Sequence, residues 1–312
     1  SDIQVNESEY KTLKSLDNYL EIKDNTIKFK NHKIKSNFKN NKFTINGSGK
    51  IKLQEIFEDI NYSIDSDDKD FKFNSKLLLS ELNFNSQEYL KNFITNLDKT
   101  TTLKDQKIEI NLDKKKLLIN GQGKIKFNND FEDIKFKVLK IKNKFNFNTE
   151  LDLDNTPFKI NFLNFVKNDK SKTRIRFAGS YEPENSLDFE DISIINENNR
   201  LIFKNIFLNK NNLIEKVDEV KLEFLDNQNK KNNILLKKIK QNKYQITGSS
   251  FNAEKLIDSL LVGKKDNNLK LFQNDIKISL NLKEVYLDNL YLVNDLNGNL
   301  NIKNKQKAKN QI

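Results

Sequence analysis

Residues 42–60 read KFTINGSGKIKLQEIFEDI, and residues 116–134 read KLLINGQGKIKFNNDFEDI. At an offset of 74 residues, twelve of the nineteen positions are identical. The same offset, without gaps, aligns residues 71–79 (FKFNSKLLL) with residues 145–153 (FNFNTELDL), at five identities in nine. A repeat of this kind is typical of one supersecondary unit that is stacked several times into an elongated body.

A third copy of the repeat is degraded but keeps its spacing. Gly179 stands ten residues before a Phe-Glu-Asp-Ile segment at 189–192, the same spacing that the two clear copies have. The sequence therefore predicts one elongated β-repeat body over residues 1–312, with Gly248 and Gly298 as marks of two further units. The expected repeat units are residues 31–79, 105–153 and, in degraded form, 174–224, and a polar tail is expected at 303–312.

Most of the chain alternates apolar with polar residues. Strict alternation predicts strands with one apolar face and one solvated face. Clusters such as Asn40-Asn41 suit the turns of antiparallel hairpins. We expect about 18 strands of the usual length of about 5–6 residues. Helical spacing of apolar residues predicts short helices at 8–20, 86–97 and 252–262. The expected fold class is thus all-β, mainly antiparallel, with a few short helices.

The composition excludes several kinds of chemistry. The chain has 312 residues with a formal net charge of +11, and it contains no Cys, no Met, no Trp and a single His. Without Cys there is no disulfide, no thiolate zinc site and no cysteine nucleophile, and one His excludes His-pair metal motifs. The lack of Met indicates a processed protein or an excised segment. The longest unbroken apolar run is residues 290–293, so no transmembrane helix is predicted.

Three motifs have a structural interpretation that is better than the functional one. The I-N-G-x-G-K-I-K segment lacks the Ser or Thr and the helix of a phosphate loop, which favours strand glycines that permit close packing. The adjacent carboxylates Glu58 and Asp59 should point to opposite faces of a strand. The run from Asp65 to Asp70 lacks the glycine of a calcium loop and has Lys76 in place of its final glutamate, so it predicts a solvated hairpin tip.

His32 has Gln106 as its counterpart in the second copy, and we interpret it as a surface residue. The sequence offers no second residue that would orient this imidazole as a base. No catalytic residue, no metal site and no cofactor is predicted, and the chain is not expected to be an enzyme.

The alternation raises the question of what covers the apolar face. Large open sheets normally curl or split into two packed layers. If the layers stay open, 18 strands at about 4.8 Å each give a groove of roughly 85 Å, a shape that suits acyl chains. We expect an elongated, curled repeat sheet with an apolar groove. The residues expected to line it are Ile108, Ile110, Leu112, Phe145, Phe147, Leu151, Leu153, Phe158, Ile160, Phe162, Ile175, Phe177, Ile276, Ile278, Leu280 and Leu282.

Two other interpretations stay open. If the layers close, the same face is a core, and the chain is a structural or adhesive β-repeat protein. The basic charge and the aromatic residues are also compatible with a platform for single-stranded nucleic acid. However, the aromatics share a face with aliphatic residues, while Lys and Asn fill the other face. This segregation favours a half-buried sheet, and no nucleic acid is expected as a partner.

The C-terminal part of the chain resembles a known family. The resemblance rests on 244–261 (YQITGSSFNAEKLIDSLL), 276–288 (IKISLNLKEVYLD), 296–302 (LNGNLNI), 157–165 (PFKINFLNF) and 174–181 (RIRFAGSY). These segments, with 244–302 as the main stretch, resemble the AsmA-like superfamily, in particular its long YhdP-like periplasmic branch. The motifs are patterns of the fold and not catalytic signatures.

This resemblance implies a periplasmic, inner-membrane-anchored protein of a Gram-negative bacterium. It implies an apolar groove that conducts phospholipids between the inner and outer membranes, in the service of outer-membrane biogenesis and envelope maintenance. The implied partners are phospholipid acyl chains, with membrane contact made through flanking regions outside this chain. The family's N-terminal membrane helix is absent here, and so is a recognisable outer-membrane contact element. The chain is therefore expected to be one length of a lipid-conducting segment.

Overall fold

The structure of the chain is a computed structural model, which describes residues 1–11, 26–211, 213–257 and 274–302. Strands account for 73% of the chain and helices for 4%, which confirms the expected all-β, mainly antiparallel class. The chain divides into two compact units. Unit 1 comprises Ser1–Lys91 and Asn96–Asp152, and unit 2 comprises Asn92–Thr95 and Leu153–Ile312.

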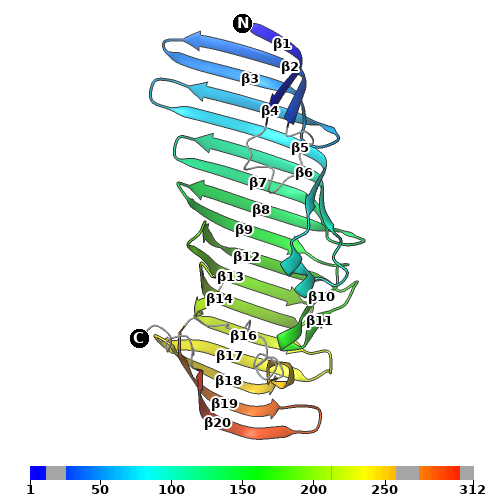
Figure 1. Cartoon of the computed structure of the whole chain (residues 1–312), viewed down its shortest axis with the longest axis vertical. Coiled ribbons are helices and arrows are strands. Elements are labelled where there is room, and N and C mark those ends of the chain that lie inside the picture. The colour runs from blue at the N-terminus through cyan, green and yellow to red at the C-terminus, as the bar shows by residue number, and fades with distance from the viewer. Residues whose placement is uncertain (12–25, 212, 258–273, 303–312) are drawn as a thin grey trace, which may run out of the picture. The chain divides into compact units, whose positions relative to one another are not determined.

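Unit 1 is an antiparallel meander in which each strand pairs with the next one along the chain (Figure 1). The connection between β2 and β3 consists of Asn40 and Asn41, both with positive φ, a conformation that Asn tolerates and that a two-residue hairpin needs. The strands are β1 (Asp2–Lys11), β2 (Thr26–Lys39), β3 (Lys42–Lys52), β4 (Phe57–Ser66), β5 (Phe71–Asn85), β6 (Thr100–Asp113), β7 (Lys116–Lys126), β8 (Phe131–Ile141) and β9 (Lys144–Asp152).

Unit 2 contains a second run of paired strands, in which β18 and β19 are parallel and the other described pairs are antiparallel. A separate two-stranded sheet is formed by β10 and β11, with the 3₁₀ helix η3 between them. The strands are β10 (Phe158–Ile160), β11 (Phe165–Lys167), β12 (Thr173–Glu182), β13 (Ser186–Asn196), β14 (Asn199–Asn209), β15 (Ile214–Lys216), β16 (Glu219–Leu225), β17 (Lys231–Lys240), β18 (Lys243–Asn252), β19 (Ile276–Tyr286) and β20 (Leu292–Ile302), and η3 is Asn161–Leu163.

The two clear copies of the repeat share contacts as well as sequence. Gly47 pairs with Tyr62 across β3 and β4, and Gly121 pairs with Phe136 across β7 and β8. In both copies the aromatic ring fills the space that a β-carbon on the glycine would need. The glycines therefore serve close packing within strands, as the sequence predicts.

The charged contacts repeat in the same way. Lys50 pairs with Asp59 at 2.9 Å, and their counterparts Lys124 and Asp133 pair at 2.7 Å. A lysine ammonium lies over the ring of Phe57 in the first copy, and another over the ring of its counterpart in the second. The third stretch differs, because Gly179 pairs with Phe189 itself and not with a later residue. The third stretch therefore keeps the sequence spacing of the repeat but not its strand register.

Two local expectations agree with the structure. The run from Asp65 to Asp70 forms the tip between β4 and β5, where the Asp67 carboxylate accepts hydrogen bonds from the backbone N–H of Lys69 and Asp70. Glu58 is 5% exposed and lies on the face opposite to Asp59, whose carboxylate reaches Lys50. The hairpin tip and the opposed carboxylates are thus as predicted.

The predicted helix at 8–20 is wrong over its described part, because residues up to Lys11 belong to β1 and pair with β2. A long-range ladder therefore overrides the local helical spacing; residues 12–20 lie outside the described residues. The helix at 86–97 is reduced to the 3₁₀ helix η2 (Glu88–Asn92), because Ile94 is extended and bridges to Phe158. Residues 254–257 are helical, and residues 258–262 of that predicted helix, like the tail at 303–312, lie outside the described residues.

Candidate functional site

One face of unit 1 carries rows of apolar side chains, and we call it the inner face. The first row runs from β5 to β9 through Ser75, Ile110, Ile119, Val138 and Phe147, each the cross-strand partner of the one before. The parallel rows beside it contain Ile108, Leu112, Phe145 and Leu151. Six of the residues predicted to line a groove thus share one face of one unit.

The other predicted groove residues belong to unit 2. Leu153 is 2% exposed, and its backbone N–H donates to the carbonyl of Thr173. Ile175 and Phe177 lie on β12 opposite Ile194 and Ile192 of β13. The set Ile276, Ile278, Leu280 and Leu282 lies on β19, and the first two form a buried cluster with Val217 and Tyr244.

Part of the apolar face of unit 2 is covered by the sheet of β10 and β11. Phe158 and Ile160 are buried, and Phe165 has no exposed surface. The Phe165 ring lies 5.8 Å from that of Phe158 and 5.4 Å from that of Phe224 on β16, measured between ring centroids. Phe162, in η3, is 44% exposed. Of the predicted groove residues in this segment, Phe158 and Ile160 therefore lie on the buried side of the cover, and Phe162 lies on its exposed side.

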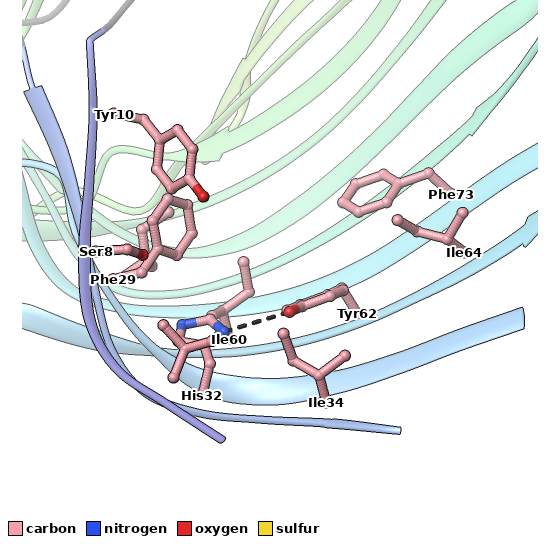
Figure 2. A pocket seen from close by; sticks show the side chains of 11 residues that line it. Ser8, Tyr10, Phe29, His32, Ile34, Ile60, Tyr62, Ile64 and Phe73 are labelled. Carbon is pink, nitrogen blue, oxygen red and sulfur yellow. Dashed lines mark hydrogen bonds between the residues drawn. The ribbon is translucent and has the colours of Figure 1, made fainter. Parts of the chain in front are cut away.

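The inner face of unit 1 is hollowed at its N-terminal end into a pocket of about 430 Å³. Figure 2 shows Tyr10 and Phe29 on one side of it and Ile64 and Phe73 on the other. Tyr10 is 62% exposed, so the pocket is open to water at that side. Its walls come from five strands, β1 to β5, and consist of Val5, Ser8, Tyr10, Phe29, His32, Ile34, Ile51, Ile60, Tyr62, Ile64 and Phe73.

His32 lies in this pocket and is buried, so its interpretation as a surface residue is wrong. Asn31 has positive φ at a bulge between β2 and β3, and the bulge directs His32 onto the inner face. The ring stacks edge-on against Phe29 and covers Gly49, where a β-carbon would meet it. The burial of His32 is not evident from the sequence, because its neighbours are polar and the bulge shifts which residues of the alternating pattern face inward.

The hydrogen bonds around His32 indicate which of its two ring nitrogens carries the hydrogen when the imidazole is neutral. Its Nε2 lies 3.0 Å from the carbonyl oxygen of Lys50, which can only accept, so Nε2 carries the hydrogen. The Nδ1 atom, 3.4 Å from the Tyr62 hydroxyl, is then left to accept from it (Figure 2). In the second copy, Gln106 donates from Nε2 to the carbonyl of Lys124 at 2.7 Å, the equivalent bond at the equivalent bulge.

Tyr62 places a phenol hydroxyl in the pocket beside His32. Burial raises the pKa of its hydroxyl above the ordinary value of 10.0, and the nearby Tyr10 raises it further. The counterpart in the second copy is Phe136, which has no hydroxyl. The pocket of the first copy therefore has an imidazole and a phenol where the second copy has an amide and a plain ring.

The raised pKa of Tyr62 predicts how the free energy of unfolding changes at alkaline pH. The folded chain keeps Tyr62 protonated at a pH where the unfolded chain loses the proton, so this stability is complete below pH 10 and is lost as the pH rises through the folded pKa. We expect Tyr62→Phe to lose less of its free energy of unfolding than the natural chain between pH 9 and the highest pH at which the chain stays folded. Denaturant titrations across that range measure it.

The matched variant is Tyr244→Phe in unit 2, because burial is also the first cause of the raised pKa of Tyr244. Both variants should flatten the alkaline loss. A Tyr62→Phe chain that follows the natural chain at every pH would contradict the assigned burial of this hydroxyl.

Comparisons of the chain with protein-family models, with curated proteins and with solved structures found no match. Among the described residues, no helix has the length and apolar character needed to cross a bilayer. No group of three or more metal-binding side chains is present in the described part of the chain. The candidate site is therefore defined by its own geometry: an apolar, partly open surface with the imidazole of His32 and the hydroxyls of Ser8, Tyr10 and Tyr62 near one end.

Sequence reasoning found the inner face on β6 and β9 but missed the pocket. Ser8 and Tyr10 are hidden because they belong to the stretch 8–20, whose apolar residues have helical spacing. The one available signal was the difference between the copies, His32 and Tyr62 in the first against Gln106 and Phe136 in the second.

Proposed function

We propose that this chain is a non-enzymatic lipid-binding protein that holds acyl chains against the inner face of unit 1. The observation that carries the proposal is the pocket of about 430 Å³ with its mostly apolar walls (Figure 2). Exposed apolar surface of this extent commonly marks a binding site. Each methylene that a bound chain buries contributes about 0.8 kcal/mol, without any need for directional contacts.

The polar groups of the pocket fit this ligand class. Burying a polar group is costly unless it is hydrogen-bonded, and His32 and Tyr62 partly satisfy one another. Apart from the hydroxyls of Ser8 and Tyr10, the remaining wall is apolar and suits a chain that has no hydrogen bonds to offer. In the intact protein, the same binding would serve the passage of phospholipids between the inner and outer membranes, in a periplasmic protein anchored through a segment outside this chain.

A structural β-repeat protein with a sealed core is the second candidate. The observation that favours it lies in unit 2, where Phe165 of the cover is completely buried against Phe224 of β16. Under this alternative the inner face of unit 1 would be covered by a further segment in the same way. The two candidates differ in whether lipid reaches the inner face.

A charge on the inner face tests the proposal. Phe147→Asp places a carboxylate in the row that includes Ile119 and Val138, where a bound acyl chain would have to desolvate it. We expect the amount of co-purified lipid to fall by roughly tenfold, which corresponds to about 1.4 kcal/mol. Lipid mass spectrometry on the protein purified from bacterial membranes and periplasm, beside a mock purification, measures it.

Asn148→Asp is the matched control, because it adds the same charge one position away on the exposed opposite face. It should retain the lipid content of the natural chain. Loss of the fold in Phe147→Asp, seen by circular dichroism, would support a sealed core. Lipid at the level of the mock purification in the natural chain would reject the lipid-binding proposal.

A further inference from the structure

A cluster of lysines lies at one edge of the inner face of unit 1. The hairpin tips between β6 and β7 and between β8 and β9 enclose a hollow of about 560 Å³. The apolar side chains among its lining residues are Leu112, Leu117 and Ile141. Around them stand five lysines, which we call the lysine rim: Lys114, Lys115, Lys116, Lys140 and Lys142.

The acidic residue of this hollow does not neutralise the rim. The Asp113 carboxylate accepts hydrogen bonds from the backbone N–H of Lys115 and Lys116, at 2.8 and 2.9 Å, and these bonds lower its pKa. It also forms an ion pair with Lys116, at 3.8 Å. Within the part of the chain that the structure describes, the ammonium groups of the other four rim lysines form no ion pair. The hollow therefore carries an excess of positive charge.

The rim is joined to the pocket by an apolar row. Across the strands from β4 to β7, the successive partners are Ile64, Phe73, Leu112 and Leu117. The next partner, on β8, is Lys140, which lies on the inner face with its ammonium 5.2 Å from the centre of the Phe145 ring. Four steps of about 4.8 Å place it about 19 Å from Ile64 along the sheet. One surface thus runs from an apolar pocket to a group of lysines, four of which form no ion pair within the described residues.

The first copy of the repeat has no such rim, although its hairpins are equivalent. At the offset of 74 residues, Asn40 and Asn41 stand in place of Lys114 and Lys115, Ser66 in place of Lys140, and Asp68 in place of Lys142. The fold therefore does not require lysines at these positions. Only the second copy combines the apolar row with an excess of positive charge.

We infer that the lysine rim binds the anionic phosphate headgroup of a lipid whose acyl chains lie along this row. The inference rests on the proposed lipid binding and narrows it to anionic lipids. Lysine is a common phosphate partner, since its ammonium is a compact charge on a flexible stem. The occupant is an amphiphile, because a free phosphate would leave Leu112 and Leu117 exposed and a plain hydrocarbon would leave the ammonium groups unpaired.

The experiment uses two soluble short-chain lipids that differ only in headgroup. Dihexanoyl phosphatidylglycerol is anionic, dihexanoyl phosphatidylcholine is zwitterionic, and their acyl chains are identical. Each lipid is titrated into the delipidated full chain at low salt, and the heat of binding is measured by calorimetry. The anionic lipid should bind about tenfold more tightly, because each lysine near an anionic lipid contributes about 1 kcal/mol. The preference should shrink at higher salt.

Two triple variants distinguish the effect of the rim lysines on lipid binding from the effect of a lower net charge of the chain. Lys114→Gln, Lys140→Gln and Lys142→Gln together should lower the affinity for phosphatidylglycerol to the level of phosphatidylcholine and so abolish the preference. The control changes Lys107, Lys135 and Lys137 to Gln, which removes the same charge from exposed positions on the opposite face. It should keep the preference.

Each contrary result has a distinct meaning. Equal binding of the two lipids would overturn the headgroup site and leave lipid binding intact. Binding of neither lipid would overturn both proposals. Equal affinity for glycerol phosphate and for the anionic lipid would show a phosphate site without an acyl site. Binding to phosphatidylglycerol vesicles but not to the monomeric lipid would show a membrane-docking edge, which also overturns the inference.

Discussion

Phe165→Ala is expected to lower the free energy of unfolding by about 4 kcal/mol, within the range of about 3–5 kcal/mol for buried phenylalanines. The ring has no exposed surface, and it lies between Phe158 in the same small sheet and Phe224 of β16. Its removal leaves a cavity at the contact that holds the cover on the apolar face of unit 2. Guanidinium denaturation followed by far-ultraviolet circular dichroism measures the loss.

Phe162→Ala is the matched control, because it removes the same side chain from the same segment at a position that is 44% exposed. We expect a change of less than about 0.5 kcal/mol there. Hydrogen exchange should also increase in β10, β11 and β16 of the Phe165 variant and not in the Phe162 variant. Similar losses in the two variants would contradict the division of this segment into an inner and an outer side.

Much of the fold follows from local pattern. The period-two alternation predicts the strands because each strand has one apolar and one solvated face. The two copies at a constant offset predict which strands are equivalent. Even individual contacts are foreseeable, such as the packing of strand glycines against a neighbour, which the structure realises in Gly47 with Tyr62. These features depend on residues near one another in the sequence or on the ladder between adjacent strands.

The rest depends on contacts that local pattern does not encode. The segment at Ser8 to Lys11 has helical spacing, but pairing with β2 decides its conformation. The parallel pairing of β18 with β19 requires a crossover and breaks the meander, and nothing in the alternation signals it. His32 looks like a surface residue because the bulge at Asn31 reverses which residues face inward.

For the candidate site, the sequence predicts which residues share a face but not which long-range contacts cover that face. Periodicity places Ile110 and Phe147 on one face, and the strand register confirms that they share a cross-strand row. Periodicity cannot say what lies above a face. Phe158 was grouped with these residues as part of a groove, yet it belongs to the cover of unit 2, whose contacts join residues far apart in the chain. The pocket also needed β1, whose strand conformation comes only from tertiary pairing.

Gly248→Ala is expected to destabilise unit 2 by about 3 kcal/mol, near the upper end of the usual cost of overpacking. A β-carbon on Gly248 would collide with the backbone carbonyl of Asn233 on the neighbouring strand β17, and a backbone atom cannot move aside as the end of a flexible side chain can. Gly298→Ala makes the same chemical change on β20, where a β-carbon meets nothing within 4 Å. Because alanine restricts the unfolded chain more than glycine does, this second variant should gain up to about 0.5 kcal/mol. Denaturant titrations of the two variants measure both effects, and a Gly248→Ala chain as stable as the Gly298→Ala chain would refute the close approach of β17 and β18.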